Sequence, residues 1–301
     1  MHRYILAIFC LAAPGAATIA ETPKLHRATI AAAPVSENAY VVTGGISNAG
    51  FVIGATGVIA IDAQMNAEDA KLMQSEIAKR TRKPVTTIIL THSDVDHLYG
   101  LPAWPKGLRI LAQENLTPQL QTLVANPDSR MPPPQGLASY FPTETVRHSK
   151  TLVIDGVQVV LTHLRAGHTN GDLVIYFPVE RVAYVGDLLT FGDLNNPSAG
   201  LFPVIHLDKH GSSAGWLDVM KAVLALEADV FIGGHGPARK TREQIEEAVA
   251  ATERRRTEVK RLFDQGMELA QIKAELNDPA PVAPLFFPTF VETVYRELLR
   301  E

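Results

Sequence analysis

A dense cluster of potential metal ligands follows one apolar segment of the chain. Residues 91–100, "THSDVDHLYG", come directly after "VTTIIL" and contain His92, Asp94, Asp96 and His97. Imidazole and carboxylate groups are typical ligands of zinc, iron and manganese. Two histidines and two aspartates within six consecutive positions therefore predict a metal site.

Three further polar residues follow apolar segments in the same way. They are His168 in "RAGHTNGD", Asp187 in "VAYVGD" and His235 in "FIGGHGP". A neighbouring glycine permits close approach of the backbone at such a position. One histidine after a strand is more often a structural residue, but four clusters in succession indicate ligands that meet at a sheet edge.

Alternating strand-like and helix-like segments must position these ligands. Patterns rich in β-branched residues predict strands at 39–45, 50–62, 85–90, 108–113, 151–155, 157–164, 172–178, 181–187 and 229–234. Apolar stripes at helical spacing predict helices at 66–81 (with Asn66 as N-cap), 114–124, 212–227, 241–266, 268–276 and 288–300. This order favours two packed sheets with helices outside.

One long segment interrupts this pattern. Residues 125–149 contain three consecutive prolines and several turn formers, which predict an irregular loop. A loop of this length can act as a lid or binding loop. A passive surface insertion is an equally good interpretation.

The ligand pattern resembles that of the metallo-β-lactamase-fold hydrolases. Their H-x-H-x-D-H motif reads His92-Ser93-Asp94-Val95-Asp96-His97 here, and the resemblance runs from about residue 40 to residue 237. An Asp-x-Gly motif near the front of that family reads Asp62-Ala63-Gln64, so the aspartate is kept and the glycine is not. The resemblance implies an αββα sandwich of two mixed β-sheets with helices on the outer faces.

The resemblance also implies a role for each ligand. One metal ion would be held by His92, Asp94 and His168, and a second by Asp96, His97 and His235, with Asp187 as a bridge. Asp96 would have a catalytic role by orienting the attacking hydroxide. His206 and His210 fall where the family often places residues that contact substrate.

Two divalent metal ions of this kind predict hydrolysis of a small molecule. A bridging hydroxide would attack an ester-, lactone- or thioester-like bond. Zinc is the expected metal, with iron or manganese as the alternative because of Asp94. The other functions to be weighed are a non-hydrolytic or redox metalloprotein that uses the same pocket, and a β-lactamase, whose usual Cys or Ser ligand is not seen here.

Asp94 departs from the family, which typically has histidine there. The carboxylate adds one negative charge to the ligands and should make the metals less electrophilic. The chain could then be a working hydrolase with a modified first site, a protein that fills only the second site, or one that has lost hydrolysis. If it is an attenuated hydrolase, Asp94→His is expected to raise zinc retention and ester hydrolysis.

Composition and the N-terminus indicate an exported globular protein. The 301 residues are 46% hydrophobic and 20% charged, with a formal charge of -4 and no basic run that would suggest nucleic acid. Residues 1–20 match a secretory signal peptide, with cleavage after Ala20. The expected product is a periplasmic or secreted protein without a membrane anchor, comprising residues 21–301 as a single domain with C-terminal helices. Those helices could pack on the domain or on a second chain.

Overall fold

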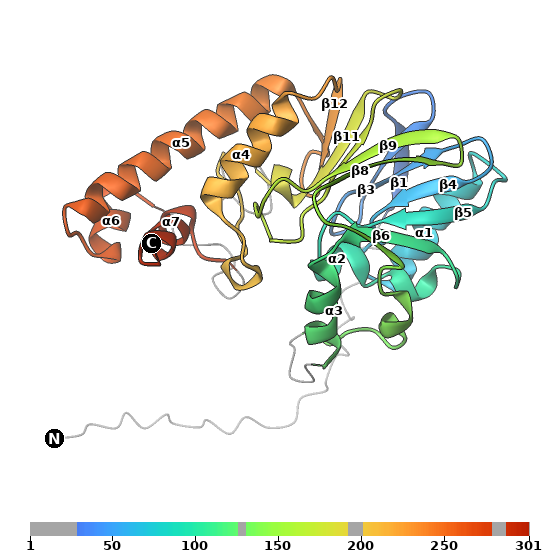
Figure 1. Ribbon diagram of the computed structural model, residues 1–301, viewed down its shortest axis with the longest axis horizontal. Coiled ribbons are helices and arrows are strands. Elements are labelled where there is room, and N and C mark those ends of the chain that lie inside the picture. Colours follow the sequence, from blue (N-terminus) through green and yellow to red (C-terminus); the bar gives the residue numbers. More distant parts are fainter. Residues whose placement is uncertain (1–28, 126–130, 192–200, 279–286, 301) are drawn as a thin grey trace, which may run out of the picture.

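Two facing β-sheets form the centre of the molecule, and helices cover both outer faces. The computed structural model describes residues 29–125, 131–191, 201–278 and 287–300. Figure 1 shows the two sheets side by side, with α4 and α5 on one side and α1 to α3 on the other. The predicted αββα sandwich is confirmed. The predicted signal peptide, residues 1–20, lies outside the described residues.

The first sheet has seven strands in chain order. Its first four strands are antiparallel, whereas β4, β5, β6 and β7 run parallel. The strands are β1 (Ala31–Pro34), β2 (Ala39–Thr43), β3 (Ala49–Ile53), β4 (Val58–Ile61), β5 (Val85–Ile89), β6 (Arg109–Gln113) and β7 (Glu144–Val146).

The second sheet has six strands in the order β13-β12-β11-β10-β9-β8. Among the strands described for this sheet, only β11 and β12 pair in parallel. The strands are β8 (Ser149–Ile154), β9 (Val157–Thr162), β10 (Val174–Phe177), β11 (Val182–Gly186), β12 (Val230–Gly233) and β13 (Arg239–Lys240).

The α-helices follow the predicted segments closely, with one short helix in addition. They are α1 (Ala67–Ala78), α2 (Val95–Leu98), α3 (Leu116–Ala125), α4 (Ser213–Leu224), α5 (Arg242–Asp264), α6 (Leu269–Glu275) and α7 (Phe290–Leu298). The N-cap prediction for α1 is confirmed, because the Asn66 side chain accepts a hydrogen bond from the Asp69 amide at 2.9 Å. Short 3₁₀ turns lie at η1 (Leu101–Ala103), η2 (Leu137–Tyr140), η3 (Asp187–Leu189) and η4 (Leu207–Lys209).

Strand β4 illustrates why the sheet is buried on both faces. Side chains alternate across a strand, so residues two apart share a face. Ile59 and Ile61 point into the core between the sheets, whereas Val58 and Ala60 point into the core under the outer helices. A strand covered on both sides reads as a continuous apolar run, as this one does.

The structure refines several predicted boundaries. The segment 50–62 forms a hairpin of β3 and β4 rather than one strand, because Gly54 and Gly57 close a turn with an N–H to O distance of 2.8 Å. The predicted irregular loop 125–149 contains η2 and the edge strand β7, which pairs with β6. The short helix α2 was not predicted, although it carries two of the predicted ligands.

The C-terminal helices pack on this chain. Helices α5, α6 and α7 share an apolar cluster, and Figure 1 shows α6 and α7 beneath the far end of α5. The Glu297 carboxylate accepts a hydrogen bond from the Ser213 amide at 2.6 Å and pairs with Arg256 at 2.6 Å. This contact joins α7 to the start of α4. Among the described residues, no helix has the length and apolar character needed to cross a membrane.

Tyr184 connects the two sheets. It is 2% exposed, and its hydroxyl donates to the Tyr40 carbonyl of β2 at 2.8 Å. The ring lies over Gly50, where an added Cβ would meet Tyr184 Cε1 at 2.1 Å. Only glycine at position 50 leaves room for this ring.

Removal of the Tyr184 hydroxyl should destabilise the fold. We expect Tyr184→Phe to lower the free energy of unfolding by about 1 kcal/mol, because it deletes a buried hydrogen bond without changing the ring. The control is Tyr176→Phe on the adjacent strand, whose hydroxyl bonds the Glu227 carbonyl at an exposed position. Its effect should stay within about 0.5 kcal/mol. Urea unfolding measures both, and equal effects would contradict this account.

Candidate metal centre

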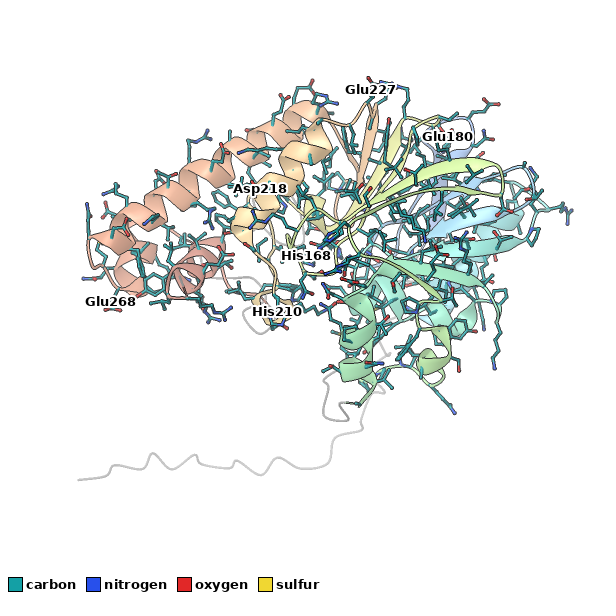
Figure 2. All side chains as sticks on the ribbon, viewed as in Figure 1. His168, Glu180, His210, Asp218, Glu227 and Glu268 are labelled. Atoms are coloured by element: carbon teal, nitrogen blue, oxygen red, sulfur yellow. The ribbon has the colours of Figure 1, made fainter. Side chains whose placement is uncertain are left out.

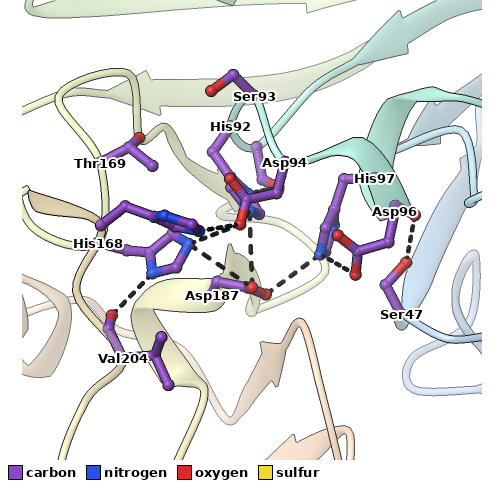
Figure 3. Close-up of polar contacts among 12 residues, drawn as sticks. Ser47, His92, Ser93, Asp94, Asp96, His97, His168, Thr169, Asp187 and Val204 are labelled. Carbon is purple, nitrogen blue, oxygen red and sulfur yellow. Dashed lines mark hydrogen bonds and ion pairs between the residues drawn. The ribbon is translucent and has the colours of Figure 1, made fainter. Parts of the chain in front are cut away.

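The predicted ligands come from the ends of four strands. His92 and Asp94 lie in the loop after β5, and Asp96 and His97 lie on α2. The others are His168 in the β9–β10 loop, Asp187 at the start of η3 directly after β11, and His235 just after β12. Figure 3 shows that the side chains of His92, Asp94, His97, His168 and Asp187 point toward a common centre.

These seven residues form two adjacent groups. His92, Asp94, His168 and Asp187 make one group, and Asp96, His97 and His235 make the other. Within each group the potential ligand atoms lie within 4.8 Å of one another. The geometry therefore brings together all of the residues that the sequence pattern singled out as ligands.

Asp187 lies between the two groups. Its Oδ1 is 3.2 Å from His97 Nε2, and its Oδ2 is 3.2 Å from His235 Nε2. The same Oδ2 is 3.6 Å from His92 Nε2 and 3.7 Å from His168 Nε2. The backbone must come close to this carboxylate, since a Cβ added at Gly234 would lie 1.8 Å from Asp187 Oδ1. Asp187 can thus reach cations in both groups.

Asp62 holds in place the loop after β5, which carries His92 and Asp94. Its Oδ1 accepts from the Thr91 amide at 2.8 Å, and its Oδ2 accepts from the Thr91 hydroxyl at 2.8 Å. Oδ2 also lies 2.8 Å from His97 Nδ1, which leaves Nε2 of that ring facing the site. A carboxylate behind a ligating histidine orients the ring and raises its basicity.

The buried polar atoms fit divalent metal ions. Among the described residues, His92 Nε2, His97 Nε2 and Asp187 Oδ1 are buried and make no hydrogen bond. Buried polar atoms without partners are rare in folded proteins. These three face the centre of the cluster, where a cation would satisfy them. The donor set of imidazoles and carboxylates suits such an ion.

The electrostatics of the cluster also favour cations. Burial opposes protonation of His235, yet Asp187 and Asp96 raise its pKa to about 11. Burial and His97 oppose protonation of His92, yet Asp94 and Asp187 raise its pKa to about 9. Burial opposes ionisation of Asp187 as well, but the histidines around it hold its pKa well below the usual range. In the absence of metal, protons would supply the positive charge that these carboxylates require.

Asp94 has two partners outside the predicted ligand set. Its Oδ2 is 2.8 Å from His206 Nε2, and its Oδ1 is 2.5 Å from Lys209 Nζ. Burial raises the cost of a charge on Asp94, but His206 and Lys209 hold the pKa of that carboxyl well below its usual range. The sequence motif shows the negative charge that Asp94 adds to the ligands, but it does not show that Lys209 lies beside that charge.

The two histidines predicted to contact substrate lie on the same turn. His206 touches Asp94, and His210 lines a pocket of about 500 Å³ beside the first group. Figure 2 shows His210 beneath His168, on the turn that contains η4. The pocket is also lined by Ser93, Asn115 and Lys209. The role of both histidines in binding substrate stays a prediction.

Sequence reasoning missed the residues that support the ligands. His168 Nδ1 lies 2.8 Å from the Val204 carbonyl, and the Ser47 hydroxyl donates to the Asp96 carbonyl at 2.7 Å. Both partners are far from the ligands in sequence and have no motif of their own. The sequence does give a weak signal for Lys209, because it lies between His206 and His210, the two histidines predicted to contact substrate.

Comparisons with known proteins agree with this geometry. The chain is 28% identical over 205 residues to the 2,4-dinitroanisole O-demethylase subunit alpha of Nocardioides sp. (strain JS1661), covering 67% of this chain and 56% of that protein. It is 24% identical over 230 residues to the linear primary-alkylsulfatase of Pseudomonas sp. (strain ATCC 19151), covering 65% of this chain and 42% of that protein. The chain thus spans about half the length of the curated relatives it matches.

Solved structures show the same fold. A stereoselective inverting sec-alkylsulfatase from Pseudomonas sp. superposes with a TM-score of 0.69 at 16% identity, over 90% of this chain and 50% of that one. A metallo-β-lactamase from Pontibacter korlensis superposes with a TM-score of 0.58 at 18% identity, over 74% of this chain and 99% of that one.

The family profile of the metallo-β-lactamase superfamily matches residues 42–235. That span includes the seven predicted ligands and the strands β11 and β12, which pair in parallel in the second sheet. Because it covers more than half of the 301 residues, the chain belongs to the metallo-β-lactamase superfamily.

Proposed function

We propose that the chain is an exported hydrolase that uses a two-metal centre to cleave an ester-, lactone- or thioester-like bond in a small molecule. The observation that carries this proposal is the position of Asp187 between two groups of ligands, within 3.2 Å of His97 and of His235 and within 3.7 Å of His168. Relatives in the superfamily are hydrolases such as sulfatases and β-lactamases, which supports hydrolysis as the reaction type.

The protein residues prepare the site for this chemistry. His92, Asp94 and His168 would hold one ion, and Asp96, His97 and His235 the other. Two such ions supply Lewis acidity and acidify water, so that a nucleophile exists at neutral pH. Asp96 is anchored through its backbone by Ser47 and lies 3.0 Å from His235. Its carboxylate can accept a hydrogen bond from an attacking water and orient it.

The pocket beside Asp94 has both polar and apolar walls. Its lining includes the polar residues Asn115, Gln119 and Asn170 and the apolar residues Pro118 and Leu123. The polar side chains already have partners in the protein, since Gln119 Nε2 donates to Asn170 Oδ1 at 2.5 Å and Asn115 donates to the Asn170 carbonyl at 2.8 Å. We therefore expect a small substrate with both polar and apolar parts.

Other reactions are supported by particular observations. Sulfate-ester hydrolysis is the second candidate, because the linear primary-alkylsulfatase is 24% identical to this chain over 230 residues. A β-lactamase is favoured only by a match to the metallo-β-lactamase type 2 of Elizabethkingia meningoseptica, at 26% identity over 147 residues. A redox role with iron or manganese rests on the carboxylate of Asp94.

A substrate panel tests the proposed reaction. We expect the purified protein with added Zn²⁺ to hydrolyse at least one ester, lactone or thioester, and to lose that activity on chelation. Asp187→Asn should lower kcat/KM by at least about 100-fold, since even the outer partners of metal ligands contribute 10–100-fold. The matched control is Asp218→Asn at an exposed position of α4, which should leave kcat/KM unchanged.

The outcomes separate the candidates. Turnover of alkyl sulfates alone would replace the proposal by sulfate-ester hydrolysis. Turnover that survives both chelation and Asp187→Asn would contradict a two-metal mechanism. Absence of turnover on the whole panel would refute the proposed reaction.

Export is supported by the composition of residues 1–20, which have an apolar stretch followed by small residues. The expected N-terminus of the mature protein is Glu21, since cleavage is proposed after Ala20. N-terminal sequencing of the protein from a periplasmic extract and from the cytoplasm tests this. An unprocessed chain confined to the cytoplasm would count against export.

A further inference from the structure

The turn after residue 205 encloses the carboxylate that replaces the family's histidine. Lys209 Nζ lies 2.5 Å from Asp94 Oδ1 and 3.3 Å from the Ser93 carbonyl. His206 Nε2 lies 2.8 Å from the other oxygen, Oδ2. Asp94 is 7% exposed, so both partners act on a buried charge.

The turn is fixed to the metal centre by its backbone. The His206 amide donates to the His168 carbonyl at 2.9 Å, and the Asn170 amide donates to the Lys209 carbonyl at 3.0 Å. These bonds join the turn to the loop that carries His168. The Lys209 side chain is therefore held at a defined distance from the ligands, although 24% of it remains exposed toward the pocket.

The two oxygens of Asp94 face different groups. Oδ2 is on the side of the ligands, at 3.2 Å from His168 Nε2 and 3.7 Å from His92 Nε2, and it also contacts His206 Nε2 at 2.8 Å. Oδ1 is occupied by the ammonium of Lys209. The carboxylate thus presents a single oxygen to the site, as a histidine would present a single nitrogen.

The charges of the pair cancel. Replacement of a neutral histidine by aspartate adds one negative charge, and Lys209 adds one positive charge next to it. At this separation in a buried setting, the attraction is much stronger than between the same charges in water. With Asp94 and Lys209 together, the first group carries the same net charge as it would with a neutral histidine at position 94 and no lysine beside it.

We infer that Lys209 supplies the counter-charge of Asp94, so that the Asp94–Lys209 pair takes the place of a neutral histidine at the metal centre. The inference rests on the proposed two-metal function. It also changes the expectation for Asp94→His, because that substitution alone would leave an unbalanced lysine cation beside the metal ions.

Zinc affinity in a double-mutant cycle tests the inference without any substrate. The dissociation constant for Zn²⁺ would be measured by competition with a chromophoric chelator for wild type, Lys209→Met, Asp94→His and the double variant. We expect Lys209→Met to bind Zn²⁺ roughly tenfold more tightly, because it removes a positive charge beside the cation site. Asp94→His should bind Zn²⁺ roughly tenfold more weakly, because it removes a negative charge. The double variant should return to within about threefold of wild type, because it restores the net charge of the site.

Two further variants serve as controls. Lys209→Arg keeps the positive charge and should keep the wild-type affinity. Lys221→Met removes an exposed lysine of α4 that pairs with Glu253 at 2.7 Å rather than with a ligand, and should also leave the affinity unchanged. Circular dichroism of each variant verifies that it is folded.

A purely structural role for Lys209 predicts the opposite result. Its loss would then loosen the turn and weaken Zn²⁺ binding in both backgrounds, and this outcome would overturn the inference. If Lys209→Met does not fold, the comparison of the double variant with Asp94→His still decides, since the second substitution must tighten binding. Wild-type protein that binds no metal would refute this inference and the proposed function together. Protein that binds metal but hydrolyses nothing would refute only the proposed function.

Discussion

The burial of several carboxylates at one end of two sheets is the constraint on which the rest of this structure depends. Asp62, Asp94 and Asp187 are all at most 7% exposed. An isolated charge in such a place is very costly unless cations or hydrogen-bond donors surround it. The histidines, the Thr91 hydroxyl and amide, and Lys209 all serve this need. The site is therefore built to hold positive charge, whether from protons or from metal ions.

The sandwich places these groups where several strands end. Strand β4 is apolar and buried throughout, and β5 ends in buried isoleucines, so the charged ligands lie beyond the strand ends. Strands β11 and β12 run parallel and deliver Asp187 and His235 to the same edge. The metal centre is thus a consequence of strand direction, and the outer helices mainly secure the sheets that carry it.

Much of this could be predicted from the sequence because the signals are local. Apolar runs of fixed period gave the strands and helices, and the Asn66 cap gave the start of α1. The spacing of polar residues after those runs singled out the seven residues that the structure brings together. The short helix α2 escaped prediction because four residues carry no periodic signal. Strand β7 escaped because its pairing with β6 is a tertiary contact within a segment of turn formers.

Gln64 shows how a departure from the family pattern is accommodated. It stands where the family usually has glycine, and its φ is +71°. Glycine adopts this left-handed region freely, whereas other residues adopt it at a cost of order 1 kcal/mol. The backbone is nevertheless held there, because the Gln64 carbonyl accepts from the Gly100 amide at 2.8 Å. The sequence revealed the substitution but not the contact that compensates for it.

Asp94 is the second departure, and its compensation is electrostatic. A motif shows the charge of one residue, but the partner of that charge lies 115 positions away. Only the folded chain brings Lys209 to Asp94. The interpretation of an altered ligand therefore changes once its surroundings are known, from a weakened site to one whose charge is balanced.

The central claim is that the buried cluster holds two metal ions, and elemental analysis tests it most directly. The protein would be purified without added metal and its metal content measured per chain. The account predicts about two divalent ions per chain, with zinc, iron or manganese identified by the same measurement. One ion or fewer, unchanged after incubation with excess Zn²⁺ and dialysis, would contradict it.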